Sequence, residues 1–531
     1  MIIRSINLFA WVRKLCSSGL VGALLLTVGC ATLPDEFERP DTFTLPNTQQ
    51  TTIADMIRPG LQRNTGESGF IMLSRGLEAL EIRLAMAAMA EISIDIQTFI
   101  WQADTAGVLL AESLVTAAQR GVRVRILVDD INSGDRDELI ATLDSHPNIS
   151  FRIFNPFGTR TYLASINIRR SFELITNMSR LNHRMHNKIF VADNLVGIAG
   201  GRNVGDEYFG LSEKYNFIDL DILTLGPIVN GISSSFDEYW NSVWAYPITA
   251  FRSAPSAERI LAIFKDLQSD AEALAGAIGF VDKPLSEERV FLQSMLDRAV
   301  YAEAEIIFDS PDKVRGANVD NPMEVVFGLT EQAESTQSEL LIISPYFILG
   351  DDGREILVAL RRRGVAVRVM TNSMAAADHM TSFSGFSRHR ASVLSDGIQI
   401  SELKPDLGKF VQEEKIPRST ANGGVHAKAY VFDRERVFIG SFNLDPRSIN
   451  INTEIGLLIH SEALARELGE FYDQLAHPDY SWQPILNERG KTIWIDSSGT
   501  QELRYSSDPE AGIWRKTLVR LFKLLPIERQ L

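Results

Sequence analysis

Cysteine is scarce in this sequence. Only Cys16 and Cys30 are cysteines among 531 residues. Cys16 lies in an N-terminal segment that resembles an export signal, so the mature chain would hold one cysteine and no internal disulfide. This excludes a fold held together by disulfides. The 45% of hydrophobic residues are instead enough for large buried cores, in a chain long enough for about two or three domains.

Positive charge is in short supply as well. The chain has 53 Lys and Arg residues against 68 Asp and Glu residues, which gives a formal net charge of −15. A protein that binds duplex nucleic acid normally carries a basic surface that displaces counterions from the phosphates. The charge balance therefore disfavours nucleic acid as a partner, although a local basic pocket is compatible with it.

The apolar run near the N-terminus is too short to cross a bilayer as a helix. It covers residues 20–28, follows a basic start and ends in the sequence LTVGC at Cys30. The small residues before Cys30 resemble a bacterial lipobox, with Thr27 where Leu is usual. We therefore predict a lipoprotein-type signal peptide at residues 1–30, with an ordinary signal peptide and an uncleaved anchor as the alternatives.

Lipidation of Cys30 would attach the protein to a membrane of the bacterial cell envelope, facing the periplasm. Ala31 provides no acidic retention signal, which favours the outer membrane. Residues 31–60 are polar and contain proline, as expected for a tether between the membrane and the folded body.

The folded body repeats one helix-to-strand pattern. Residues 119–128 and 362–370 each run from a helical stretch through a glycine into an alternating β-branched stretch. Upstream, residues 93–100 and 340–347 are matching strand candidates. Strands that alternate with helices predict an α/β fold with a mainly parallel sheet covered on both faces. Two such units indicate pseudo-twofold symmetry, with a site at their interface.

These repeats divide the chain. We predict an N-terminal unit at residues 61–250, a helical and loop-like connecting region at 251–325, a C-terminal unit at 326–500 and an amphipathic tail at 501–531. In the tail, apolar residues share one helical face and basic residues lie between them. Such a helix either lies in a membrane interface or packs on the body with its basic face in water.

The strongest signal is a polar motif that occurs twice, as MHNKIFVADNLVGIAGGRN and VHAKAYVFDRERVFIGSFN. Each position of the second copy follows its match in the first by 240 residues (426 − 186). The matched pairs are His186 and His426, Lys188 and Lys428, Asp193 and Asp433, Gly201 and Ser441, and Asn203 and Asn443. This fixed register predicts a site for phosphoryl transfer.

The spacing within each copy suits that chemistry. On a strand, residues i and i+2 face the same side, so each histidine would project into one space together with its lysine. A lysine ammonium beside an imidazole can hold an anionic phosphoryl oxygen. Gly201 and Ser441 would let the substrate phosphate approach closely, and Asn203 and Asn443 would donate to its non-bridging oxygens.

Two such sets around one phosphodiester would let one histidine attack phosphorus while the other protonates the leaving alkoxide. The first ring must be neutral and the second charged, so each needs a carboxylate that sets its tautomer. We predict Asp219 for His186 and Glu454 for His426, with Asp221 as the alternative.

No metal or other cofactor is expected at this site. Lysine is not a metal ligand, and neither motif has the His, Cys and carboxylate spacing of a zinc site. His183 lies three residues before His186 but has no counterpart in the second copy.

The two motifs resemble the HxKxxxxD signatures of the phospholipase D superfamily, and the resemblance extends over residues 70–500. Within it, residues 100–102, 127–130 and 154–157 are similar to bacterial cardiolipin synthases, most closely the C-type. This resemblance implies two fused phospholipase D-like α/β/α sandwich domains with the active site at their interface. It also implies that the His, Lys and Asp of both motifs are catalytic, with His186 as the nucleophile and His426 as the acid and base.

By the same resemblance, the expected reaction condenses phosphatidylglycerol with a second phospholipid, phosphatidylethanolamine or cardiolipin being the alternatives. The intermediate would be a phosphohistidine. The competing interpretations are hydrolysis by a phospholipase D in the strict sense, a nuclease, and an inactive scaffold that binds lipid.

Overall fold

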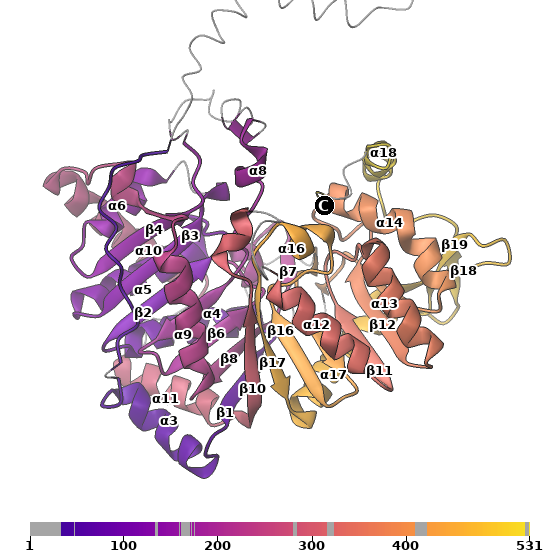
Figure 1. Ribbon diagram of the computed structural model, residues 1–531, viewed down its shortest axis with the longest axis horizontal. Helices are drawn as coiled ribbons and strands as arrows, with labels where there is room; N and C mark the ends of the chain where they lie inside the picture. The colour runs from indigo at the N-terminus through magenta and orange to yellow at the C-terminus, as the bar shows by residue number, and fades with distance from the viewer. Residues whose placement is uncertain are drawn as a thin grey trace, which may run out of the picture.

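The computed structural model of the protein describes residues 33–46, 48–132, 136–158, 160, 170, 173–174, 176–279, 284–315, 323–408, 422–525 and 530. Cys30 and the predicted signal peptide lie outside these residues. Among the described residues, one sheet of 18 strands runs through the molecule, and helices cover both of its faces (Figure 1). The predicted α/β fold is therefore confirmed.

The first half of the sheet is built around three parallel strands. These are β2 (Ser93–Thr98), β3 (Arg123–Asp129) and β4 (Ile149–Phe154). Antiparallel strands continue the sheet in the order β5 (Ile189–Ala192), β6 (Val196–Gly200), β8 (Asp221–Leu225) and β1 (Ser68–Leu73), while β9 (Ala245–Pro247) borders β4. Nearly every residue of β2, β3 and β4 is buried, because helices pack on both faces.

The second half repeats this order. The parallel strands are β11 (Glu339–Ile343), β12 (Ala366–Asn372) and β13 (Gln399–Leu403), and the antiparallel strands are β15 (Ala429–Phe432), β16 (Arg436–Gly440) and β17 (Ile455–His460). β18 (Ser481–Leu486), β19 (Thr492–Asp496) and β20 (Leu503–Tyr505) extend the far edge. The matching strand order is the pseudo-twofold repeat that the sequence predicts.

The large sheet continues from the first half into the second through one shared strand. β10 (Val300–Phe308) pairs with β1 through its first three residues and with β17 through its last six. Alternation of apolar and polar residues, the usual sign of a strand, is confined to its centre at residues 302–305. The connecting region predicted as helix and loop therefore also contains a strand.

The helices form an outer layer on each half and an inner layer between them. The outer layers contain α3 (Thr52–Arg63), α4 (Gly76–Met89), α5 (Thr105–Gln119), α6 (Asp137–Asp144), α10 (Ala257–Ala277) and α11 (Leu285–Leu296) on the first half, and α12 (Glu324–Ser335), α13 (Gly350–Arg362) and α14 (Met380–Ser395) on the second. The inner layer contains α9 (Ile228–Asn241) and α17 (Glu462–Ala476). One apolar core contains residues of both, including Phe236 and Tyr472, so the halves are packed as one body.

Short elements lie where the halves meet. They are α8 (Met178–Leu181), β7 (Asn216–Ile218), β14 (Gly423–Val425) and α16 (Pro446–Asn450), and α18 (Ile513–Phe522) follows near the end of the chain. β7 and β14 form a small parallel sheet of their own, with one strand from each half. Within the described ranges, each helix is too short or too polar to cross a membrane.

Candidate active site

Each histidine of the double motif lies in an extended segment that hydrogen-bonds to the other half of the molecule. The backbone N–H of His426 donates to the carbonyl of Ile218 at 2.8 Å, at the end of the β7–β14 pair. The backbone N–H of His186 donates to the carbonyl of Thr453 at 2.9 Å. The two halves therefore exchange equivalent hydrogen bonds on the two sides of one site.

This exchange determines which carboxylate supports which ring. Nδ1 of His186 lies 2.8 Å from Oε2 of Glu454, and Nδ1 of His426 lies 2.6 Å from Oδ2 of Asp219. Our predicted assignment was the reverse and is wrong, because the pairs cross the interface. Each carboxylate directly follows the residue whose carbonyl accepts from the histidine backbone of the other half, so it meets that half's ring.

Asp221, the predicted alternative, has a different role. Its carboxylate forms ion pairs with Arg83 at 2.7 Å and with Arg202 at 3.3 Å. All three side chains are almost fully buried. Asp221 therefore stabilises the packing of the first half through these buried ion pairs.

Gly201 and Ser441 lie next to the supporting carboxylates, and their role in binding the substrate phosphate stays a prediction. The hydroxyl of Ser441 donates to Oε2 of Glu454 at 2.5 Å, and the hydroxyl of Ser448 donates to Oε1 at 2.7 Å. At Gly201, an added Cβ atom would lie 2.1 Å from Oδ1 of Asp219, closer than atoms can approach. The longer glutamate is thus held by two hydroxyls, whereas the shorter aspartate occupies space that a side chain would fill.

The two lysines are buried next to their histidines. Nζ of Lys188 donates to the carbonyl of His186 at 2.5 Å, and Nζ of Lys428 donates to the carbonyl of His426. Burial lowers the pKa of Lys188 well below its usual range and that of Lys428 to about 8, although Asp219 and Glu454 oppose this. An anionic phosphodiester would supply the negative charge that favours both ammonium groups.

The motif asparagines are buried beside the same space. Oδ1 of Asn203 accepts from the backbone N–H of Ile100 at 3.2 Å. Oδ1 of Asn443 has no hydrogen-bond partner within the part of the chain that the structure describes. Neither amide is committed to a carboxylate, and their role as donors to phosphate stays a prediction.

Asp193 and Asp433, which the motif resemblance made catalytic, lie away from the histidines. Each occupies a tight turn with positive φ (51° and 55°) at the far end of its motif strand. Oδ1 of Asp193 accepts from the backbone N–H groups of Ile92 and Ser93 at 2.8 and 2.9 Å, where β2 begins. Asp433 accepts equivalent bonds where β11 begins. The prediction of a catalytic role is corrected: six residues, four of them in a strand, separate each aspartate from its histidine, and the aspartate carboxylate anchors the start of another strand.

We expect Asp193→Ala to destabilise the protein without changing its turnover. The substitution leaves buried N–H groups unpaired, which should lower the midpoint of thermal unfolding by roughly 3–8 °C. Calorimetry of the variant would measure this, with the exposed Asp270→Ala on α10 as the matched control. A loss of turnover in fully folded Asp193→Ala would contradict the structural role.

The two imidazoles have different electrostatic environments. Burial and the charges of Lys188 and Lys428 hold the pKa of His186 well below its usual value. Burial also lowers the pKa of His426, but the charge and hydrogen bond of Asp219 oppose the shift. His186 is therefore the ring that is more readily neutral, as a nucleophile must be, and His426 is the ring that is more readily charged.

The supporting carboxylates differ in the same sense. Burial raises the pKa of Glu454 to about 7 despite Lys188 and the two hydroxyls. Burial would also raise the pKa of Asp219, but the charge and hydrogen bond of His426 together with Lys428 hold it below its usual range. Near neutral pH, the Asp219–His426 pair thus has more ionic character than the Glu454–His186 pair.

Aromatic side chains surround both rings. The ring centroids of Phe99 and His186 are 5.2 Å apart, and those of Phe217 and Tyr208 lie 4.8 and 5.2 Å from that of His426. Sequence reasoning missed these residues and Ser448, because nothing in their local pattern separates them from ordinary core positions. In the described ranges, no group of three or more His, Cys, Asp or Glu side chains is placed to hold a metal ion.

Residues 84–240 and 329–476 both match the family model described as cardiolipin synthase, PLD-like domain. The chain belongs to the phospholipase D superfamily. The resemblance of the double motif is therefore confirmed, and the protein is a phospholipase D-like, phospholipid-modifying enzyme.

Its relatives include cardiolipin synthases of two bacteria. Cardiolipin synthase C of Escherichia coli K12 is 35% identical over 483 residues, which is 90% of this chain and 99% of that protein. A cardiolipin synthase of Staphylococcus aureus is 25% identical over 442 residues, which is 82% of this chain and 74% of that one. The crystal structure of a phosphatidylserine synthase from Haemophilus influenzae, 14% identical, covers 90% of this chain and all of its own with a TM-score of 0.56, which supports the fold.

Proposed function

We propose that the protein is a phosphatidyltransferase that makes cardiolipin by joining phosphatidylglycerol to the phosphatidyl group of a second phospholipid. The observation that carries this proposal is the pair of buried histidines, each supported by a carboxylate from the other half of the molecule. The 35% identity to cardiolipin synthase C of E. coli supports the choice of lipid substrates.

In the first step, Nε2 of neutral His186 attacks the phosphorus of the donor lipid. A P–N bond forms, the P–O bond to the headgroup breaks, and His426 gives its Nε2 proton to the departing alkoxide. The donor is phosphatidylglycerol or phosphatidylethanolamine, which would release glycerol or ethanolamine. Lys188 and Lys428 stabilise the added negative charge on the phosphoryl oxygens.

In the second step, His426 acts as the base. It takes the proton from the free hydroxyl of a phosphatidylglycerol headgroup, whose oxygen attacks the same phosphorus and displaces His186. The aromatic rings around both histidines favour this acceptor over bulk water, because they limit access of water to the intermediate.

We further propose that the enzyme works at a membrane of the cell envelope, attached through lipidated Cys30 and facing the periplasm. The supporting observation is the LTVGC sequence. The tether predicted at residues 31–60 is too long, because the backbone N–H of Thr44 donates to Asp237 at 2.8 Å and α3 begins at Thr52, with Ile53 in the core. Labelling with palmitate would test the attachment, since Cys30→Ser should remove all label from the protein.

The reaction itself is tested by product analysis. The purified full chain is incubated with vesicles of phosphatidylglycerol, with and without phosphatidylethanolamine of distinguishable acyl chains, and the lipids are analysed by mass spectrometry. We expect cardiolipin together with equimolar glycerol or ethanolamine, and no product with His186→Ala. Phosphatidic acid as the sole product would instead assign the site to hydrolysis.

A further inference from the structure

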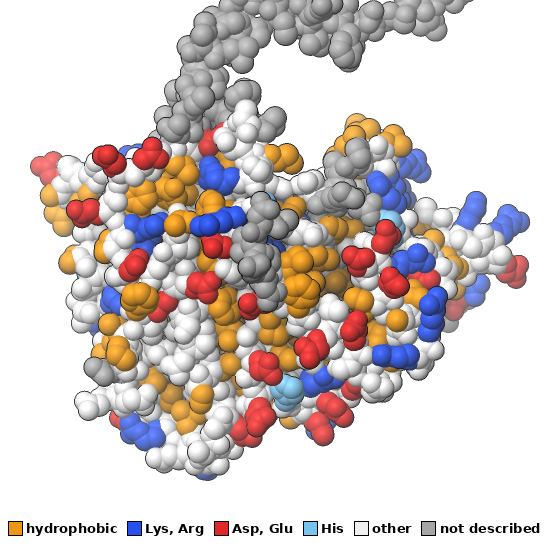
Figure 2. All heavy atoms as spheres, in the orientation of Figure 1, with side chains coloured by type: hydrophobic (Ala, Val, Ile, Leu, Met, Phe, Trp, Pro, Cys, Tyr) orange, Lys and Arg blue, Asp and Glu red, His pale blue; other side chains and the backbone are white. Residues whose placement is uncertain are grey.

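The last helix of the described chain turns its apolar side away from the protein. On α18, Ile513, Trp514 and Leu521 are 79%, 77% and 54% exposed, and Leu524 just beyond it is 80% exposed. An amphipathic helix at the surface of a soluble protein normally buries such residues against the core. The apolar side chains gather on α18 at the upper right of the molecule in Figure 2.

The residues that fasten α18 to the body are mostly basic ones. Nη1 of Arg515 donates to the carbonyls of Met374 and Ala377 at 2.9 and 2.7 Å, and Nζ of Lys523 donates to the carbonyl of Ser387 at 3.1 Å. Val519 is the buried apolar residue of the helix. The helix is thus held with its apolar side toward solvent, the reverse of the usual arrangement.

These anchors connect α18 to the wall of the site around His426. The hydroxyl of Tyr215 donates to the carbonyl of Ala376 at 2.6 Å, in the same loop that Arg515 binds. The ring of Tyr215 packs on Phe217 at 5.1 Å between centroids, and Phe217 packs on His426 at 4.8 Å. One short series of contacts therefore leads from α18 to the acid–base histidine.

A second segment with exposed apolar side chains, here called a tip like α18, lies next to the residues that surround His186. At α8, Met178 and the nearby Leu174 are 47% and 36% exposed. The carbonyl of Asn182, which ends α8, accepts from Arg447 at 2.6 Å, and Arg447 directly precedes Ser448, which binds the Glu454 carboxylate. The two tips thus belong to opposite walls of one site.

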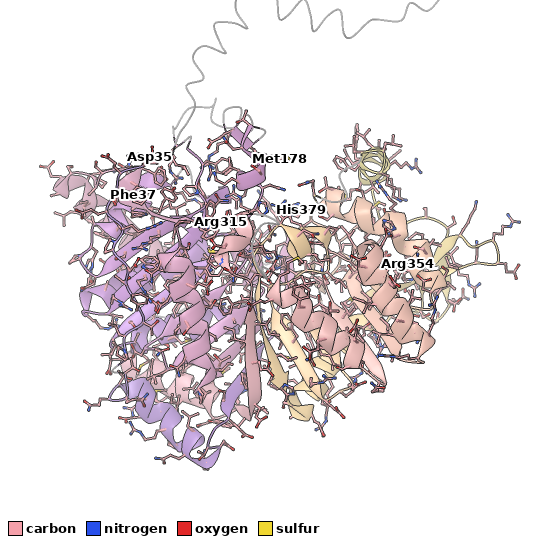
Figure 3. All side chains as sticks on the ribbon, viewed as in Figure 1. Asp35, Phe37, Met178, Arg315, Arg354 and His379 are labelled. Carbon is pink, nitrogen blue, oxygen red and sulfur yellow. The ribbon has the colours of Figure 1, made fainter. Side chains whose placement is uncertain are left out.

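Both tips lie on the same face of the molecule. In Figures 1 and 3, α8 with Met178 and α18 rise from the upper edge, and His379 lies between them. Gln530 also accepts a hydrogen bond from Asn182 at 2.6 Å. Because five residues of chain span at most about 18 Å, Leu525 at the end of α18 lies within that distance of Gln530, whose side chain contacts Asn182.

We propose that α18 and α8 form a docking face that seats the mouth of the active site on a phospholipid bilayer. In this arrangement α18 lies in the interface, with Trp514, Leu521 and Leu524 among the acyl chains. The inference rests on the proposed function, because a site for lipid headgroups must reach them where they are, at the bilayer surface.

Charge complementarity favours a bilayer that contains anionic lipid. Residues 513–525 contain four basic residues and no acidic one, in a chain whose net charge is −15. Arg515 and Lys523 bind the body, which leaves exposed Arg520 and partly exposed Lys516 to meet an anionic headgroup layer above the acyl chains. Phosphatidylglycerol, the proposed substrate, is itself such a lipid.

The test compares two forms of one substrate. The double variant Trp514→Glu, Leu521→Glu should lose at least about tenfold in rate on phosphatidylglycerol vesicles, because two charges oppose insertion, and change less than about twofold on monomeric dihexanoyl phosphatidylglycerol. The matched control is Leu261→Glu, Val290→Glu, which alters residues 71% and 69% exposed on α10 and α11, and it should behave as the parent protein.

Three outcomes would overturn the docking face. In the first, the double variant keeps its full activity on vesicles. In the second, it loses activity equally on vesicles and on the monomeric substrate. In the third, sedimentation shows that it no longer self-associates while its activity on vesicles is retained, which would assign the patch to contact with a second copy of the chain. A parent protein inactive on both forms would overturn the proposed function instead. Flotation with phosphatidylglycerol vesicles separates these cases, because it measures binding without catalysis. In a Cys30→Ser background, which removes the lipid anchor, the double variant should float less than the parent protein even if neither is active.

Discussion

Replacing His426 with asparagine is expected to stop the enzyme at the covalent stage. With a natural phospholipid, whose alkoxide must be protonated as it leaves, the rate should fall by about 10³-fold or more. With a phosphatidyl ester of p-nitrophenol, which leaves without a proton, the first step should proceed. The phosphatidyl group should then accumulate on His186, because no base remains to activate the acceptor.

Intact-protein mass spectrometry would detect the adduct, and peptide mapping would locate it. His186→Asn should form no adduct with either substrate, and the exposed His460→Asn should behave as the parent protein. Because the adduct is labile in acid, the protein is analysed at neutral pH. An adduct on His426 in the His186→Asn protein would reverse the assigned roles.

The doubled motif made the location of the site predictable from sequence. The His, Lys and Asn residues have the same spacing in two α/β repeats. If the repeats pack about a pseudo-twofold axis, their equivalent residues meet at the interface between them. The structure does bring His186 and His426 into one buried cluster, in which burial and the charges of Lys188 and Lys428 lower the pKa of both rings.

The crossing of the carboxylates could not be predicted in the same way. It depends on β7 pairing with β14 and on His186 pairing with Thr453, contacts between segments more than 200 residues apart. The local sequence of these segments does not predict which segment of the other half each will pair with. A carboxylate that follows a motif in sequence was therefore assigned to its own half, although the backbone delivers it to the other.

The motif also did not predict the role of each of its residues. His186 and Asp193 belong to one motif, but four strand residues, Ile189–Ala192, lie between them and direct them to opposite ends of β5. The amphipathic pattern of the tail was read correctly as a helix, whereas the direction of its apolar face depends on where Arg515 and Lys523 find acceptors. Both questions are decided by tertiary contacts.

The ionic difference between the two carboxylate–histidine pairs leads to the second large effect. Asp219→Asn should lower the rate on natural phospholipids by about 10³- to 10⁴-fold, in the range known for the orienting aspartate of a serine protease. The loss should shrink markedly with the p-nitrophenol ester, because Asp219 acts by keeping the leaving-group acid His426 charged. Glu454→Gln should cost less, since near neutral pH Glu454 is already partly protonated and the amide retains hydrogen-bonding capacity toward Ser448.

The Asp219→Asn substitution should also shift the pH dependence of the rate in a definite direction. Asp219 is the group that opposes the lowering of the His426 pKa, so its neutral replacement should lower that pKa further. The alkaline limb of kcat/KM, where the acid loses its proton, should then move to lower pH by about one unit or more. In Glu454→Gln the alkaline limb should stay in place. Profiles between pH 4 and 10 with both substrates would measure these shifts, and an equal shift in the two variants would contradict the assignment of Asp219 to the acid and Glu454 to the nucleophile.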